Sequence, residues 1–174
     1  MTGQGIAAKA NIYMQYNIEL RDVGCNVKND RVTMSYKFPK IKLNEEGLFG
    51  PTIENHYYKP VTYHNKTAAT NKHKTTWILR QNEQFEVFRV SDENKWFCKD
   101  RNGLFSILDN GELIMGSNEE RLSFFPNPVN STDPYHGYPI DSGECEPSIE
   151  LVDKWLEDKI IDDRLHIKIL KGQI

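Results

Sequence analysis

The chain lacks acidic residues over one long window, and this absence is its most informative feature. No Asp or Glu occurs between Glu54 and Glu83, although the 174 residues carry 25 acidic against 22 basic side chains and a formal net charge of −3. The window holds basic residues, histidines and large aromatic residues, namely Lys59, Lys66, Lys72, Lys74, Arg80, His56, His64, His73, Tyr57, Tyr58, Tyr63 and Trp77. Such a local reversal of charge sign attracts anionic partners.

Cysteine is scarce, and long apolar runs are missing. Cys25, Cys98 and Cys145 are widely spaced and form no Cys-x-x-Cys pair, so neither a zinc knuckle nor a thiol redox motif is predicted. Residues 1–10 have neither the basic start nor the apolar run of a signal peptide. No stretch approaches the roughly 20 apolar residues of a membrane helix. We therefore expect a reduced, cytoplasmic protein with no membrane partner.

The sequence also lacks the short motifs of several enzyme classes. It contains no G-x-x-x-x-G-K-S/T, no G-x-G-x-x-G, no H-E-x-x-H and no G-x-S-x-G. Nucleotide hydrolysis, dinucleotide redox chemistry, zinc proteolysis and α/β-hydrolase chemistry therefore have no support. The spacing of His56, His64 and His73 matches no ligand pattern of a metal site. We expect no cofactor and no bound metal.

Hydrophobic alternation predicts strands in the N-terminal part of the chain. Apolar side chains recur at every second position over residues 12–20 and again over 32–38, as in half-buried strands. Pro39 interrupts the second pattern. Glycine and proline over 44–56 predict a loop, and the Thr, Asn, Lys and His residues of 62–76 predict a protruding loop.

The middle of the chain resembles a meander of short strands. β-rich segments occur at 77–80, 85–90, 96–98, 104–108, 113–115 and 122–125, with turn residues between them, including a turn at 91–94. Asn102-Gly103 is a strong hairpin signal because both residues tolerate a positive φ, and Asp109-Asn110-Gly111 has the same chemistry.

The C-terminal part changes its pattern twice. Five prolines within 126–147 predict an irregular segment. Residues 148–160 predict an amphipathic helix with Ser148 as its N-cap, ended by Asp162-Asp163, and the alternation over 165–169 predicts a last strand. We predict a single α+β domain over residues 1–174. It would be a mainly antiparallel sheet or small barrel of roughly six to nine strands, with one C-terminal helix and a final strand.

The acid-free window is the first candidate for function. Its lysines would neutralise phosphates while its aromatic rings stack on bases. The competing interpretation is a solvated polar loop whose aromatic residues are anchored in the core. The leading hypothesis is a small binding protein of the inhibitor, immunity or accessory type that engages nucleic acid or an acidic protein. The residues that we expect to bind are Lys59, Tyr63, His64, Lys66, Lys72, His73, Lys74, Tyr135 and Tyr138.

The second candidate is the proline-stiffened segment 133–141. His136 lies between aromatic residues and beside Gly137, which would let the backbone approach a ligand. Asp133 or Asp141 would orient the imidazole for general base catalysis. The alternative function is therefore a small metal-independent nuclease, or a related phosphoryl- or glycosyl-processing enzyme, with a lysine or with Arg101 or Arg121 stabilising the oxyanion. The competing interpretation is a structural turn, in which Tyr138-Pro139 is a candidate cis bond.

The acidic C-terminal region is the third candidate. Residues 141–163 hold nine carboxylates against Lys154 and Lys159. This surface would dock a basic protein, or it is the ordinary solvated face of a helix.

Overall fold

A four-stranded antiparallel sheet lies at the centre of the structure, a computed structural model that describes residues 36–61 and 75–174. The strands are β1 (Phe97–Cys98), β2 (Gly103–Ser106), β3 (Leu122–Pro126) and β4 (Tyr138–Ile140), in the spatial order β1-β2-β3-β4. Each strand pairs antiparallel with the next one along the chain, which is a meander. The strands predicted at 96–98, 104–108 and 122–125 are therefore confirmed.

The α+β class is confirmed, but the number of strands is wrong. The described residues form four strands rather than six to nine, and these strands make an open meander rather than a barrel. Residues 35–174 form one unit. The predicted strand at 12–20, most of the one at 32–38 and residues 62–74 lie outside the described residues, so the single domain over 1–174 stays a prediction. Tyr36–Phe38 are described and have no strand pairing.

The strands predicted at 77–80 and 85–90 are wrong. Residues 81–93 form helix α2 (Gln81–Glu93), and Trp77 makes only an isolated bridge with Gly116. The backbone N–H of Arg80 donates to the Glu83 carboxylate at 2.7 Å, which favours a helix start. Apolar residues on several sides of α2 are buried, so its sequence shows no clean helical stripe.

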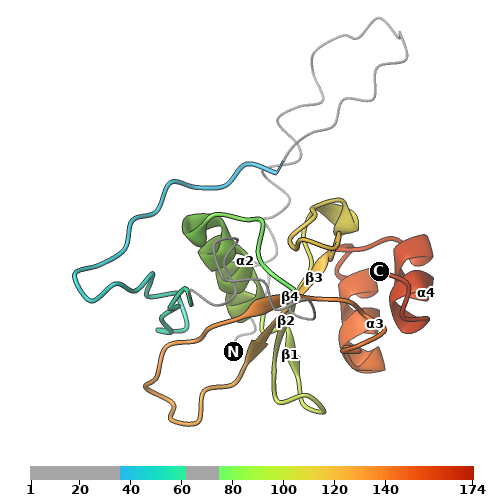
Figure 1. Ribbon diagram of the computed structural model, residues 1–174. Coiled ribbons are helices and arrows are strands. Elements are labelled where there is room, and N and C mark those ends of the chain that lie inside the picture. Colours follow the sequence, from blue (N-terminus) through green and yellow to red (C-terminus); the bar gives the residue numbers. More distant parts are fainter. Residues whose placement is uncertain (1–35, 62–74) are drawn as a thin grey trace, which may run out of the picture. The chain divides into compact units, whose positions relative to one another are not determined.

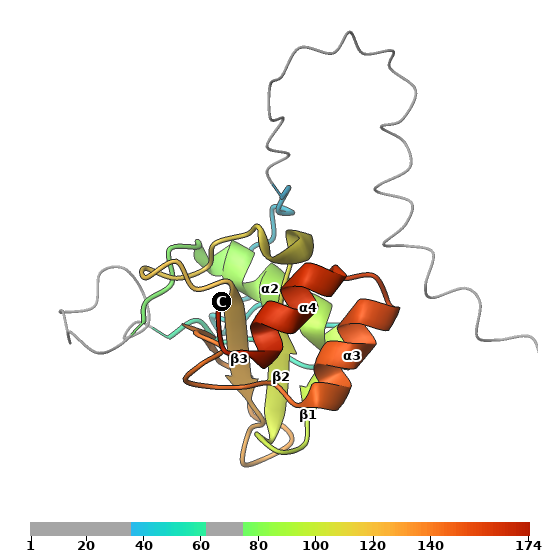
Figure 2. The same cartoon turned by 90° about the vertical axis from the view of Figure 1, so that its right-hand side faces the viewer.

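Helices cover both faces of the sheet. Helix α2 lies on one face, whereas α3 (Ile149–Glu157) and α4 (Asp163–Leu170) lie on the other (Figure 1). Phe88 of α2 packs edge-on against Phe125 with 5.4 Å between ring centroids, and Trp155 of α3 packs in the same way on Trp96 at 5.7 Å. In the view turned by 90°, α3 and α4 stand in front of the sheet (Figure 2).

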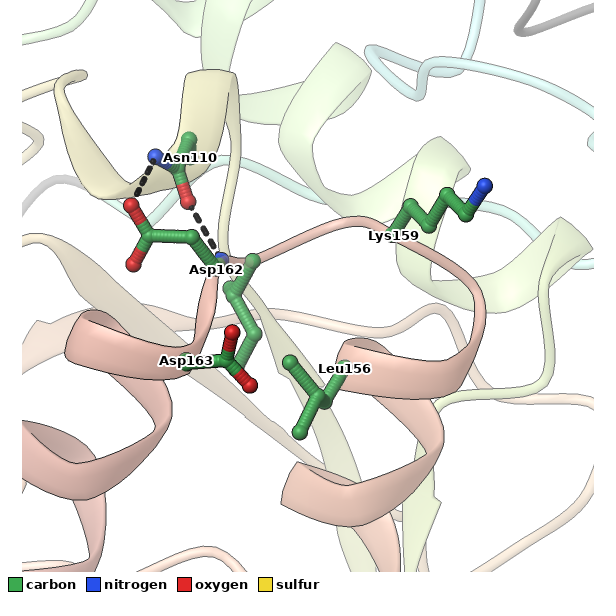
Figure 3. Close-up of a pocket in the computed structure, with 6 residues that line it drawn as sticks. Asn110, Leu156, Lys159, Asp162 and Asp163 are labelled. Atoms are coloured by element: carbon green, nitrogen blue, oxygen red, sulfur yellow. Dashed lines mark hydrogen bonds between the residues drawn. The ribbon is translucent and has the colours of Figure 1, made fainter.

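The C-terminal helix is confirmed, but the last strand is wrong. Helix α3 follows Ser148, as the sequence predicted, whereas residues 163–170 form a second helix, α4. Asp162 begins α4 rather than ending α3, because its carboxylate accepts the backbone N–H of Leu165 at 2.8 Å. Figure 3 shows that Asn110, in the short 3-10 turn η2 (Asp109–Gly111), forms two hydrogen bonds with Asp162.

Two further predictions about local structure are corrected. The proline-rich segment 126–147 contains β4, and Pro139 is tolerated there because β4 is an edge strand. Residues 113–115 form no strand. The backbone N–H of Met115 instead donates to the Glu120 carbonyl at 2.7 Å and closes a tight turn. The Tyr138–Pro139 bond is not cis, whereas Gly50–Pro51 is.

None of the helices in the described ranges has the length and apolar character to cross a membrane.

Candidate functional site

Two segments that the sequence analysis treated as separate candidates lie side by side. Tyr58 forms a parallel bridge with Tyr135. The backbone N–H of Tyr135 donates to the Tyr57 carbonyl at 2.8 Å, and that of Lys59 donates to the Tyr135 carbonyl at 2.8 Å. The acid-free window and the proline-stiffened segment therefore share one backbone pairing.

The far end of the basic segment reaches the same place. The Thr75 hydroxyl donates to the Pro139 carbonyl at 2.7 Å, and the Trp77 indole N–H donates to the Gly137 carbonyl at 2.9 Å. Residues 61 and 75 are the last described positions on either side of 62–74. Both described flanks of this segment thus lie against 135–139. We call residues 56–59, 75–77 and 135–139 the junction.

Three aromatic residues anchor the junction in the core. Tyr58 and Trp77 are almost fully buried, and Tyr135 is 7% exposed. The Tyr135 ring packs 4.9 Å from that of Phe88, and its hydroxyl donates to Asn127 Oδ1 at 3.1 Å. The structure therefore agrees with the interpretation of these rings as anchors, whereas Tyr57 and Tyr138 are half-buried.

The lysine of the junction is Lys59. Lys59 is exposed and forms no ion pair with any described residue. The acidic residue nearest to it along the chain, Glu54, lies 3.7 Å from Lys95, and on α2 the Arg89 guanidinium contacts both Glu86 and Glu93. The other expected binding residues, Tyr63, His64, Lys66, Lys72, His73 and Lys74, lie outside the described residues.

The structure does not join His136 to either of its expected partners. His136 is half-buried, and its ring forms no hydrogen bond within the described residues. Asp133 accepts from the Asn130 amide at 2.8 Å, and Asp141 accepts from the Gly143 backbone at 2.6 Å. Arg101 and Arg121 hydrogen bond to the carbonyls of Glu146 and Gly111, respectively, rather than to the junction.

A different histidine has the partner that His136 lacks. His56 Nδ1 lies 2.8 Å from Asp92 Oδ1, and the Thr52 hydroxyl donates to Asp92 Oδ2 at 2.5 Å. The His56 side chain is 37% exposed, whereas that of Asp92 is 4% exposed. The sequence analysis missed this pair because 36 positions separate the two residues and because residues 91–94 were expected to form a turn rather than the end of a helix.

A tight turn holds the His56 ring against the junction. The backbone N–H groups of Asn55 and Thr52 donate to the carbonyls of Thr52 and His56, each at 2.9 Å. The centroids of the His56 and Tyr135 rings are 5.2 Å apart. Burial, and then the negative charge of Asp92, raise the pKa of the Tyr135 hydroxyl. This hydroxyl therefore stays protonated as a donor to Asn127.

Two open hollows lie away from the junction. One has a volume of about 460 Å³ and lies between Asn110 and the connection of α3 with α4 (Figure 3). The other, of about 300 Å³, lies beside Arg101 and the start of α3. Neither hollow includes a residue of the junction.

The junction thus combines an exposed ammonium group, a partly exposed imidazole oriented by a buried carboxylate, and half-buried rings. Its carboxylate Asp92 is buried against His56, Glu54 lies close to Lys95, and Asp133 is an exposed carboxylate beside the junction. In the part of the chain that the structure describes, no group of three or more His, Cys, Asp or Glu side chains could hold a metal ion.

No protein-family model, curated protein or solved structure matches this chain.

Proposed function

We propose that this protein is a small binding protein, of the inhibitor, immunity or accessory type, that engages an anionic macromolecule at the junction. The observation that supports the proposal is the backbone pairing of Tyr57–Lys59 with Tyr135, together with the Thr75–Pro139 and Trp77–Gly137 hydrogen bonds. These contacts hold residues 57–59 and 75–77, which flank the lysine-bearing segment, against residues 135–139. The lysines of 59–74 would then act on one partner together.

The distribution of charge supports the same proposal. Four of the nine carboxylates of residues 141–163 belong to α3 and α4, namely Glu150, Asp153, Glu157 and Asp163, and these helices cover the face of the sheet opposite α2 (Figure 2). Tyr58 of the junction packs against Phe85 and Phe88 of α2, so the junction belongs to the other face. Salt screens charges beyond roughly 8–10 Å, so an anion at the junction is little affected by carboxylates across the sheet.

The experiment replaces Lys66, Lys72 and Lys74 together with glutamine and measures binding of a labelled single-stranded oligonucleotide by fluorescence anisotropy. Each phosphate contact on a single strand contributes roughly 0.7 to the slope of log K against log salt. Loss of three contacts should therefore weaken binding and reduce that slope by roughly 2.

The matched control replaces Lys154, Lys159 and Lys168, which lie on or beside α3 and α4, with glutamine. This variant loses the same charge and should keep the affinity and the salt slope of the wild type. Binding that is indifferent to salt, or an equal loss in both variants, would contradict the proposal. Polyglutamate in place of the oligonucleotide tests whether an acidic protein binds instead.

The nuclease alternative at His136 gains no support from the geometry. His136 has no carboxylate to orient its ring among the described residues, and a general base needs its ring held in one orientation. The only His–Asp pair at the junction is that of His56 with Asp92, within the described ranges.

A further inference from the structure

The His56 imidazole is held by one of its two ring nitrogens. Nδ1 lies 2.8 Å from Asp92 Oδ1, whereas Nε2 forms no hydrogen bond with any residue that the structure describes. A carboxylate accepts hydrogen bonds and donates none, so Nδ1 carries the proton. In the neutral ring, the lone pair of Nε2 is then free, and the ring is 37% exposed.

The carboxylate behind the ring is built into the fold. Asp92 lies in the last turn of α2 and is 4% exposed, and its second oxygen accepts the Thr52 hydroxyl. A buried carboxylate needs such partners to remain charged. The same charge stabilises the imidazolium that forms when Nε2 takes a proton, which is the role of the aspartate in serine hydrolases.

We propose that His56 is the general base of an RNA-cleaving activity, with Asp92 as its positioning residue. The inference rests on the proposed function, because the substrate is the anionic single strand that the junction binds. It adds a chemical step that binding alone does not require.

The choice of RNA follows from the nucleophile. A base at Nε2 can take a proton from a hydroxyl group or from water, and the Thr52 hydroxyl of this cluster is already donated to the Asp92 carboxylate. RNA carries its own nucleophile, the ribose 2′-OH, beside every phosphate.

The step balances without a co-reactant. His56 Nε2 takes the proton of the 2′-OH while the 2′-oxygen forms a bond to the adjacent phosphorus. The bond from phosphorus to the 5′-oxygen breaks, and that oxygen keeps the electron pair and takes a proton from water. The products are a 2′,3′-cyclic phosphate and a 5′-hydroxyl. The imidazolium then returns its proton to solvent.

The other charged groups around His56 are paired. Lys95 lies 3.7 Å from Glu54, and Glu93 contacts Arg89 and accepts the Ile53 backbone N–H at 3.4 Å. Tyr135 lies beneath the ring, and its hydroxyl donates to Asn127. Asp92 is thus the carboxylate that contacts the imidazole among the described residues.

The chain contains a matched control pair. His166 of α4 lies 2.7 Å from Asp153 of α3, but it is held by Nε2, and Asp153 is 51% exposed. This pair lies on the face of the sheet opposite α2, away from the junction (Figure 2). His166→Gln removes a similar contact between a histidine and an aspartate and should leave RNA cleavage unchanged.

The experiment uses the full chain and two labelled oligonucleotides of one sequence, single-stranded RNA and its 2′-O-methyl analogue. The analogue lacks the nucleophile, so its anisotropy reports binding alone. We expect both to bind and only the RNA to be cleaved, with a 2′,3′-cyclic phosphate at the new end. His56→Asn keeps an amide donor for Asp92, and it should lower the cleavage rate by at least about 100-fold, a far larger effect than any weakening of analogue binding.

Asp92→Asn should lower the rate and shift the midpoint of the rate–pH curve, which a purely structural role would not move. Salt-dependent binding of the analogue without RNA cleavage would overturn this inference and leave the proposed function intact. Cleavage that survives in His56→Asn would overturn it as well, and failure of the analogue to bind would count against both proposals.

Discussion

Gly137 illustrates how single residues of the junction are constrained by the core. A Cβ atom at this position would lie 2.1 Å from Cδ1 of Phe125 and 2.8 Å from the Phe124 carbonyl oxygen. Its own carbonyl accepts the Trp77 indole N–H. The sequence suggested that this glycine lets a ligand approach the backbone, whereas the structure shows that it lets β3 approach. The glycine correctly indicated a close approach to the backbone, but the approaching group is strand β3 rather than a ligand.

Gly137→Ala should destabilise the fold through this close contact. Overpacking a well-filled core costs about 1–3 kcal/mol, so the midpoint of urea unfolding should fall accordingly. Gly47→Ala is the matched control, because a Cβ there meets no atom within 4 Å. Its free-energy cost comes only from the backbone strain of an alanine at a φ of +74°. Equal midpoints for the two variants would show that Phe125 moves aside without cost.

At the scale of elements, two segments with strand-like alternation are helices. Leu165, Ile167 and Ile169 alternate with polar residues, yet only Ile169 is buried, and the segment begins at the Asp162 cap. Residues 85–90 have β-branched and aromatic side chains, but α2 packs them on several sides. Local alternation competes with capping and with burial. The Asp162 cap decided the structure of α4, and burial on several sides decided that of α2.

The Asp162 cap should make the stability of the fold depend on pH. Hydrogen bonds from the Leu165 backbone, and then from Asn110, lower the pKa of Asp162 below its ordinary value of 3.8. The ionised cap therefore stabilises the folded state above pH 3.8, and this contribution is lost as the pH falls through the lower folded pKa. Asp162→Asn keeps a cap without the charge, so its melting temperature should change less between pH 7 and acidic pH.

Circular dichroism melting curves at neutral and acidic pH measure this effect. Asp163→Asn is the control, since this carboxylate lies at the same helix end and accepts no hydrogen bond within the described residues. The assignment would be wrong if Asp163→Asn reduced the pH dependence as much as Asp162→Asn.

At the scale of the whole described unit, one sheet carries two separate aromatic layers. Trp77 packs near Phe125 on the α2 face, whereas Trp96 and Trp155 pack together on the α3 face. All three indoles are almost fully buried. The strands between them are only two to five residues long, so both layers pack on the same small sheet.

The two layers should unfold together. In Trp96→Phe/Trp155→Phe, fluorescence reports on Trp77, and in Trp77→Phe it reports on the other layer. We expect the fluorescence midpoint in urea to coincide with that from circular dichroism within each variant, as in a two-state transition. Separate midpoints in either variant would show that the faces are independent folding units.

The sequence by itself determined the features that depend on neighbouring residues. Asn102 has the positive φ that its hairpin signal predicted, and Val152 and Trp155 of the predicted apolar stripe are buried in α3. Only the tertiary structure decided that α2 and α4 are helices, that Tyr58 pairs with Tyr135 and that His56 contacts Asp92. The physical reason is range: propensity and periodicity act within a few residues, whereas burial and hydrogen bonds join positions that the chain alone leaves far apart.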